Sequence, residues 1–139
     1  MEKLKNKEQY QAMMGHGFCN ILAQELNEKL KLPLMMAIDY DYDIEDNVLV
    51  HMWNQLPNGD NYDTNGIMPT NITKYLEDNY EELDQFNIIE NKKDILDLLN
   101  YWKNELPLPS KNDYLQSDHK PSEAQAYLNY HINHVKQII

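Results

Sequence analysis

Three residues of this chain have the side-chain types of a nucleophile, its base and the acid that orients the base. They are Cys19, which is the only cysteine of the 139 residues, His51 and Asp63. A thiolate is the reactive form of cysteine, an imidazole can take the thiol proton, and a carboxylate can hold that imidazole in the required tautomer. Together they predict acyl transfer through a covalent intermediate on Cys19. The alternative is a cysteine that serves as a small buried hydrophobic residue and a core histidine that never meets it.

A helix is expected to begin next to Cys19. Gly17 interrupts whatever precedes it, and the apolar residues that follow recur with the period of an amphipathic helix. Those residues are Phe18, Ile21, Leu22, Leu26 and Leu30. The helix should end near Lys31, because Pro33 removes a backbone donor and disfavours helical angles before it. Cys19 would then lie in the first turn, where unpaired N–H groups and the helix dipole favour a thiolate.

His51 lies in the clearest strand, which we expect over residues 47–56. By alternation it should share one face with Leu49 and Trp53. The other face should carry Val48, Val50 and Met52. A strand that is apolar on both sides is buried on both sides, so the ionisable ring of His51 needs a partner there.

The turn after this strand decides whether Asp63 can be that partner. Pro57-Asn58-Gly59 suits a three-residue loop in which Gly59 takes a left-handed conformation and forms a bulge. In that register Trp53 faces Asp63, and the Asp63 side chain lies diagonally across from His51 on the same face. A two-residue loop at the same place would turn Asp63 to the opposite face.

An acyl-transfer site also needs donors for the oxyanion that forms on the substrate. The backbone N–H of Cys19 is one candidate. Gln11 and Asn20 are nearby side-chain amides, and Trp53 lies next to the base along the strand, so these three are further candidates for oxyanion or substrate contacts.

Two segments resemble the transglutaminase-like domains of the papain-like superfamily. The first is Gly17-x-Cys19-x-x-x-Ala23-x-x-Leu26-x-x-x-Leu30 with Leu32-Pro33, which is similar to the nucleophile helix of that family. The second is His51-x-Trp53 followed by Asp63, which is similar to its His and Asp strands. The resemblance covers residues 15–66. It implies an α+β fold with the cysteine helix packed on a small antiparallel sheet, and a triad of Cys19, His51 and Asp63.

The whole chain, residues 1–139, has the length of a single domain, in which residues 67–139 should add a helical C-terminal part. Helices are expected after Thr70 or Asn71, after Asn91 and from Pro121, with a short strand at 86–90. A further short helix is expected over residues 2–14, and residues 111–120 are expected to form a loop.

An acidic strand is expected before His51. In extended form Asp39, Asp41, Asp43 and Glu45 would share one face, either as a charged strand edge or as a surface for a basic partner. The run is not a calcium loop, because the sixth and twelfth positions counted from its first aspartate hold Ile44 and Val50.

The composition limits the partners. The formal charge is −11, and the twelve basic residues are all lysine, so nucleic-acid binding is not expected. A single cysteine excludes an internal disulfide and a multi-thiolate zinc site, and His131 with His134 are expected as core or surface residues, so no metal or cofactor is expected. No run of 18 apolar residues occurs, which predicts no membrane span and a cytoplasmic protein.

Two functions remain. The first is a cysteine-dependent acyl-transfer enzyme, whether peptidase, amidase, deamidase or transglutaminase-like cross-linker, acting on a protein or peptide, including basic ones. The alternative is an acidic, non-catalytic binding or inhibitor protein from a mobile element, which would use the strand of residues 39–46 against a basic partner.

Overall fold

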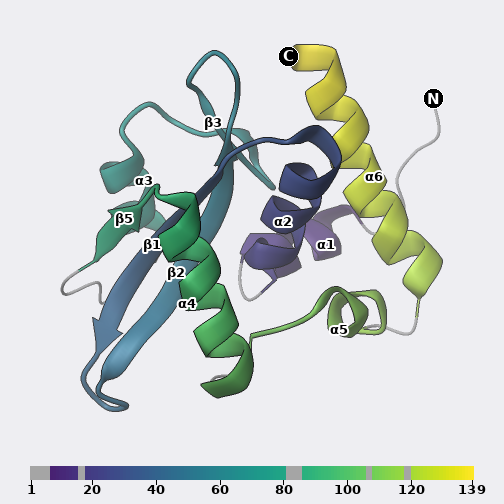
Figure 1. Cartoon of the computed structure of the whole chain (residues 1–139). Coiled ribbons are helices and arrows are strands. Elements are labelled where there is room, and N and C mark those ends of the chain that lie inside the picture. The colour runs from purple at the N-terminus through teal and green to yellow at the C-terminus, as the bar shows by residue number, and fades with distance from the viewer. Residues whose placement is uncertain (1–6, 16–17, 81–85, 106–107, 118–119) are drawn as a thin grey trace.

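The computed structural model describes residues 7–15, 18–80, 86–105, 108–117 and 120–139, which form an antiparallel sheet with helices around it (Figure 1). The strands are β1 (Leu34–Asp41), β2 (Asp46–Gln55), β3 (Asn61–Asp63), β4 (Gly66–Ile67) and β5 (Asn87–Ile89), in the sheet order β4-β3-β2-β1-β5. The helices are α1 (Lys7–Gly15), α2 (Cys19–Leu30), α3 (Ile72–Asn79), α4 (Lys92–Glu105), α5 (Lys111–Leu115) and α6 (Pro121–Ile138). The predicted α+β class is confirmed.

Helices α2 and α4 cover one face of the sheet, and α3 covers the other. Cys19 and Ala23 of α2 pack with Ile95 and Leu99 of α4 over one set of strand residues, which are Leu34, Met36, Ile38 and Met52. Leu76 of α3 packs against the opposite set, which is Met35, Ala37 and Trp53. Strand β1 therefore sends alternate side chains into two apolar clusters, and this explains why its sequence is apolar on both sides.

Helix α2 lies between the sheet and α6 (Figure 1). Tyr127 and Leu128 of α6 are fully buried and form a third cluster with Leu26 of α2 and Tyr62 of β3. The Tyr127 ring lies 5.8 Å from the ring of Tyr10 in α1. The C-terminal helix thus packs against both the helix that begins at Cys19 and the strand that ends at Asp63.

The loop expected at residues 111–120 is wrong for its first half, where α5 forms. The Ser110 hydroxyl accepts the N–H of Asp113 at 3.1 Å, and the Asp113 carboxylate accepts the N–H of Ser110 at 2.9 Å. This reciprocal capping starts the helix. Tyr114 then anchors it, since its ring is fully buried and its hydroxyl donates to the Ala124 carbonyl at 2.8 Å. One buried tyrosine and a cap outweigh the polar composition of the segment.

A bulge in β2 changes which side chains share a face with His51. Ala37 pairs with His51, whereas the next residue of β1 pairs with Leu49, so Val50 is an extra residue of β2. Leu49 accordingly packs in the cluster under α2 and α4, and Val50 packs in the cluster of Trp53. The expected placement of Leu49 on the face of His51 is wrong, because a bulge shifts the alternation by one residue.

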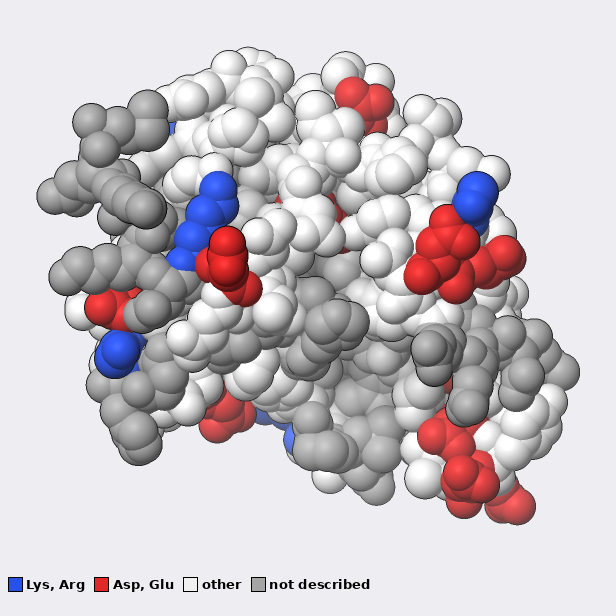
Figure 2. All heavy atoms as spheres, turned by 180° about the vertical axis from the view of Figure 1, so that it is seen from behind, with Lys and Arg blue, Asp and Glu red and all other residues white. Residues whose placement is uncertain are grey.

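The acidic segment that begins at Asp39 is not one extended strand. Strand β1 ends at Asp41, and residues 42–45 form a turn in which Glu45 has a φ of 56°. Asp39 is only 8% exposed, whereas Asp43 and Glu45 are exposed. The single acidic face expected for these four residues is therefore wrong, because the turn breaks the alternation. Acidic side chains gather instead at the free end of the β1–β2 hairpin (Figure 2).

The N-terminal helix α1 begins at Lys7. Residues 2–6 of the helix expected over 2–14, and Gly17, lie outside the described residues. Within the described part of the chain, no helix combines the length and the apolar character that crossing a membrane requires.

His131 of α6 is, as expected, a core residue. It is 3% exposed, its Nδ1 lies 2.7 Å from the Tyr62 hydroxyl, and its Nε2 has no hydrogen-bond partner among the described residues. Burial, helped by the charges of His134 and Lys7 and opposed by that of Asp63, lowers the pKa of His131 to about 4. The ring is therefore neutral at neutral pH.

Acid is expected to destabilise the protein through His131. The unfolded chain takes up a proton at this ring near pH 6.5 and the folded chain only near pH 4, so the free energy of unfolding should fall as the pH drops between these values and level off below them. The shift corresponds to at most about 3 kcal/mol. Urea unfolding at pH 7 and pH 4.5 measures the loss. His131→Gln should lose less between the two pH values than the wild type, and equal losses would contradict the assignment.

Candidate active site

Helix α2 begins at Cys19, so the thiol lies at the positive end of a helix, as predicted. Phe18 is the N-cap and makes no side-chain hydrogen bond to the helix. Its backbone carbonyl accepts the N–H of Ile21 at 3.0 Å. Because no Phe18 side-chain group caps the first N–H groups, these donors and the helix dipole favour negative charge beside Cys19.

The turn after β2 has the three-residue register that places Asp63 on the face of His51. The N–H of Leu56 donates to the carbonyl of Asp60 at 2.6 Å, and the N–H of Gly59 donates to the carbonyl of Leu56 at 2.9 Å. Gly59 has a φ of 94°, in the left-handed region that residues with a side chain rarely adopt. The strand pairs that follow continue this register. The predicted loop is confirmed.

His51 and Asp63 form a buried pair. The distance between His51 Nε2 and Asp63 Oδ2 is 2.9 Å, and the two residues are 1% and 3% exposed. Two further groups donate to the carboxylate: the Tyr75 hydroxyl to Oδ2 at 2.9 Å and the N–H of Asn65 to Oδ1 at 2.8 Å. Several donors are what a buried carboxylate needs to keep its charge, and they also fix its direction.

The other ring nitrogen of His51 meets Tyr80. The Tyr80 hydroxyl lies 2.8 Å from His51 Nδ1, and the centroids of the two rings are 5.6 Å apart. Trp53 stacks on the same imidazole, with centroids 5.7 Å apart and ring planes inclined by 20°. The imidazole is thus held at both nitrogens and packed between aromatic side chains.

The Cys19 side chain lies close enough to this imidazole to act on its pKa. Burial by itself would lower the pKa of His51, but hydrogen bonds with Asp63 and with Cys19, together with the charges of both groups, outweigh burial and raise that pKa from 6.5 to about 9. His51 and Asp63, which the sequence places at positions 51 and 63, are therefore brought together in one site, and Cys19 lies near enough to act on the pKa of the ring. The arrangement can hold a thiolate beside an imidazolium.

The side-chain donors expected to serve an oxyanion have other acceptors. Gln11 Nε2 donates to Asn65 Oδ1 at 2.7 Å. Asn20 Nδ2 donates to the Pro109 carbonyl at 3.0 Å, and Trp53 Nε1 donates to Asn61 Oδ1 at 3.0 Å. Gln11 therefore belongs to the hydrogen-bond chain behind Asp63, and Asn20 holds the segment before α5.

Sequence reasoning missed two site residues, Tyr75 and Tyr80. Tyr75 lies in the helix expected after Asn71, and Tyr80 follows the last residue of that helix. Both hydroxyls reach the site across the sheet face that α3 covers. No sequence motif near α3 links this helix to the pair of His51 and Asp63. The sequence shows only that two tyrosines, which combine an apolar ring with a polar hydroxyl, follow Asp63 in and just after a helix.

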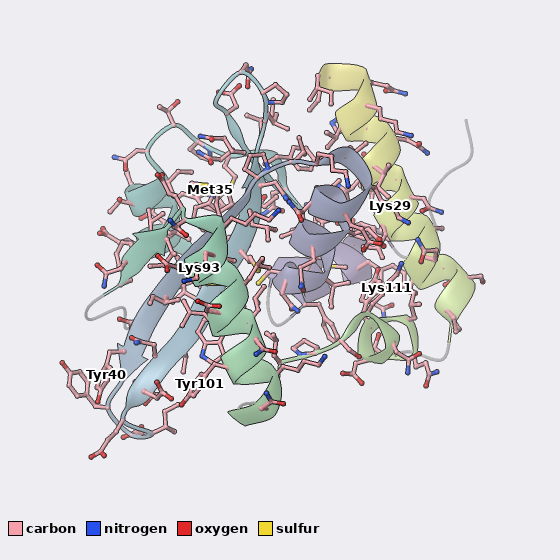
Figure 3. All side chains as sticks on the ribbon, in the orientation of Figure 1. Lys29, Met35, Tyr40, Lys93, Tyr101 and Lys111 are labelled. Atoms are coloured by element: carbon pink, nitrogen blue, oxygen red, sulfur yellow. The ribbon has the colours of Figure 1, made fainter. Side chains whose placement is uncertain are left out.

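The site is closed in this structure, since Cys19 is 6% exposed. A separate cavity of about 410 Å³ lies between α2 and α4, and none of the three residues of the site lines it. In its wall the carboxylate of Glu25 lies 2.7 Å from Lys111 Nζ, at the place where α5 approaches α2 (Figure 3). Within the described ranges, no three His, Cys, Asp or Glu side chains gather as they would around a metal ion.

No protein-family model, no curated protein and no solved structure matches this chain. The structure itself defines the class of fold, which is α+β with a five-stranded antiparallel sheet. Evidence on function therefore comes from the residues of the site.

Proposed function

We propose that this protein is a cysteine-dependent acyl-transfer enzyme with a papain-like, transglutaminase-like core. Cys19 is the nucleophile, His51 is the base and Asp63 orients the base. The observation that carries the proposal is that His51 bonds Asp63 through Nε2 while it also interacts with the Cys19 side chain. The start of α2 at the thiol and the register of the turn after β2 support it.

The reaction follows from these contacts. His51, whose Nε2–H donates to Asp63, takes the thiol proton on Nδ1. Cys19 Sγ attacks the carbonyl carbon of the acyl donor, the carbon–sulfur bond forms, and the carbonyl electron pair moves onto oxygen. When that pair returns, the leaving amine or thiolate departs with the proton of Nδ1. Water or an amine then attacks the thioester while His51 takes its proton, and the carbon–sulfur bond breaks, which releases the acyl product and returns the sulfur of Cys19.

The substrate class is an amide or thioester of a protein or peptide. Peptidase, amidase, deamidase and cross-linking reactions all pass through the same thioester and differ in the acyl acceptor. The acidic end of the β1–β2 hairpin favours substrates with positive charge. We place the enzyme in the cytoplasm, where a lone thiol stays reduced.

Transfer of an acetyl group from p-nitrophenyl acetate tests the proposal. The folded protein should release p-nitrophenolate and gain one acetyl group on Cys19, which peptide mass spectrometry locates. Cys19→Ser should not form the thioester. A folded wild type that gains no acetyl group on Cys19, or gains acetyl groups only on lysines, would refute the proposal that the protein is an acyl-transfer enzyme.

The second candidate is an acidic binding or inhibitor protein, which one surface favours. At the end of the β1–β2 hairpin, Tyr42 is 60% exposed and Ile44 is 48% exposed, next to the exposed acids Asp43 and Glu45. Apolar and acidic groups together suit a basic partner. Binding of a lysine-rich peptide should weaken steeply with salt and in Asp43→Asn. Binding that is unchanged by salt and by Asp43→Asn would exclude this surface as the binding site.

A further inference from the structure

We infer that Tyr80 is a catalytic residue, whose hydroxyl donates a hydrogen bond to the oxyanion that forms when Cys19 attacks an acyl donor. The inference rests on the proposed function and deepens it. It supplies a second oxyanion donor beside the backbone N–H of Cys19, in place of the amides of Gln11 and Asn20.

The position of the Tyr80 hydroxyl carries the inference. It lies 2.8 Å from His51 Nδ1. Asp63 bonds the other ring nitrogen, so Nδ1 is the nitrogen that can exchange a proton with Cys19 in the proposed reaction. Tyr80 also lies close enough to Cys19 for the charge of that side chain to act on the phenol. The hydroxyl therefore stands where sulfur, imidazole and an attacked carbonyl must meet.

The chemistry of the phenol suits a donor. Burial, followed by the charges of Cys19, Tyr75 and Asp63, raises the pKa of Tyr80 far above its ordinary value of 10. The hydroxyl keeps its proton in the range in which the enzyme works. An O–H group that is held in place and shielded from water stabilises a developing negative charge more than water does.

The protonation of His51 determines where the Tyr80 hydrogen points. The imidazolium is a donor at both nitrogens: Nε2–H donates to Asp63, and Nδ1–H, once the ring has taken the thiol proton, faces the Tyr80 oxygen 2.8 Å away. The hydrogen of Tyr80 must then be donated to another acceptor. After the attack, the electron-rich oxygen on the carbon that Cys19 has bonded becomes that acceptor. Tyr80 loses no proton in this step, since the proton for the leaving group comes from His51.

Two reactions of Cys19 separate this role from a merely structural one. Acetylation by p-nitrophenyl acetate passes through an oxyanion, and its leaving group departs without needing a proton. Alkylation by iodoacetamide displaces iodide at a saturated carbon and forms no oxyanion. In Tyr80→Phe, which keeps the ring against His51, acetylation should slow by about 100-fold, as the loss of one oxyanion donor does. Alkylation should change much less.

Control variants make the comparison specific. Tyr101→Phe removes a partly exposed hydroxyl of α4 that donates to Asp46 and should change neither rate. Tyr75→Phe removes the donor to Asp63 and should slow both reactions to a similar extent, because it acts through His51. The inference is overturned if Tyr80→Phe slows both reactions equally, because Tyr80 would then be a positioning residue. It is also overturned if Tyr80→Phe accelerates acetylation, because the Tyr80 hydroxyl would then hinder the access of the ester to Cys19. If the wild type forms no acetyl-Cys19, the proposed function itself has failed.

Discussion

The Asp63→Asn variant is expected to transfer acyl groups to Cys19 between about 10²- and 10⁴-fold more slowly than the wild type. Three groups donate to this carboxylate: the ring of His51, the Tyr75 hydroxyl and the N–H of Asn65. An asparagine accepts only through its one oxygen, so its amide N–H₂ must face at least one of these donors. In either orientation the charge that stabilises the imidazolium is lost, and when the N–H₂ takes the place of Oδ2 the ring of His51 also loses its tautomer.

The rate of acetyl-Cys19 formation at pH 7, followed by p-nitrophenolate release, measures this effect. Asp43→Asn is the matched control, since it removes the same charge from an exposed position on the hairpin, and it should react like the wild type with this neutral ester. An Asp63→Asn rate within threefold of the wild type would show that Asp63 does not orient the base.

A second large effect is expected in the stability of the protein in alkali. The folded chain holds the proton of His51 up to about pH 9 and the unfolded chain only up to about 6.5. The stabilisation from this raised pKa is complete below pH 6.5 and is lost as the pH rises through 9. The loss is about 3 kcal/mol at most. Protonation of His131 lowers the free energy of unfolding in acid, and deprotonation of His51 lowers it in alkali. Together these two rings favour a stability maximum near pH 6.5.

Urea unfolding of the wild type and of His51→Asn at pH 6.5 and pH 9.5 measures this loss. The variant should be less stable at both values, because the charge of Asp63 remains buried without its partner. Its loss of stability between the two should nevertheless be smaller than that of the wild type. A loss of the same size in both proteins would assign the alkaline sensitivity to other groups.

Local features of the site could be predicted from the sequence. The start of α2 at Cys19 depends on a break before the helix and on helix periodicity, and both lie within a few residues of the thiol. The register that brings Asp63 to His51 depends on Pro57-Asn58-Gly59, because the length of a tight turn sets the pairing of the strands on either side.

Features that depend on contacts between distant segments could not be predicted. The bulge at Val50 depends on how β2 lies against β1. Tyr75 reaches Asp63 and Tyr80 reaches the imidazole only because α3 packs on the face that carries His51, and no spacing in the chain encodes that packing. The turn at residues 42–45 was missed for another reason, since it lacks glycine and places Glu45 at a positive φ.

The rate at which iodoacetamide alkylates Cys19 at pH 7, in the folded wild type and in His51→Asn, tests most directly whether the thiol and the imidazole act as one unit. The proposal predicts that the wild type is alkylated at Cys19 and that the variant reacts at least about 100-fold more slowly, because the thiolate has lost its imidazolium. A folded wild type whose thiol resists the reagent until the chain is unfolded in urea would contradict it. Equal rates in the two folded proteins would contradict it as well.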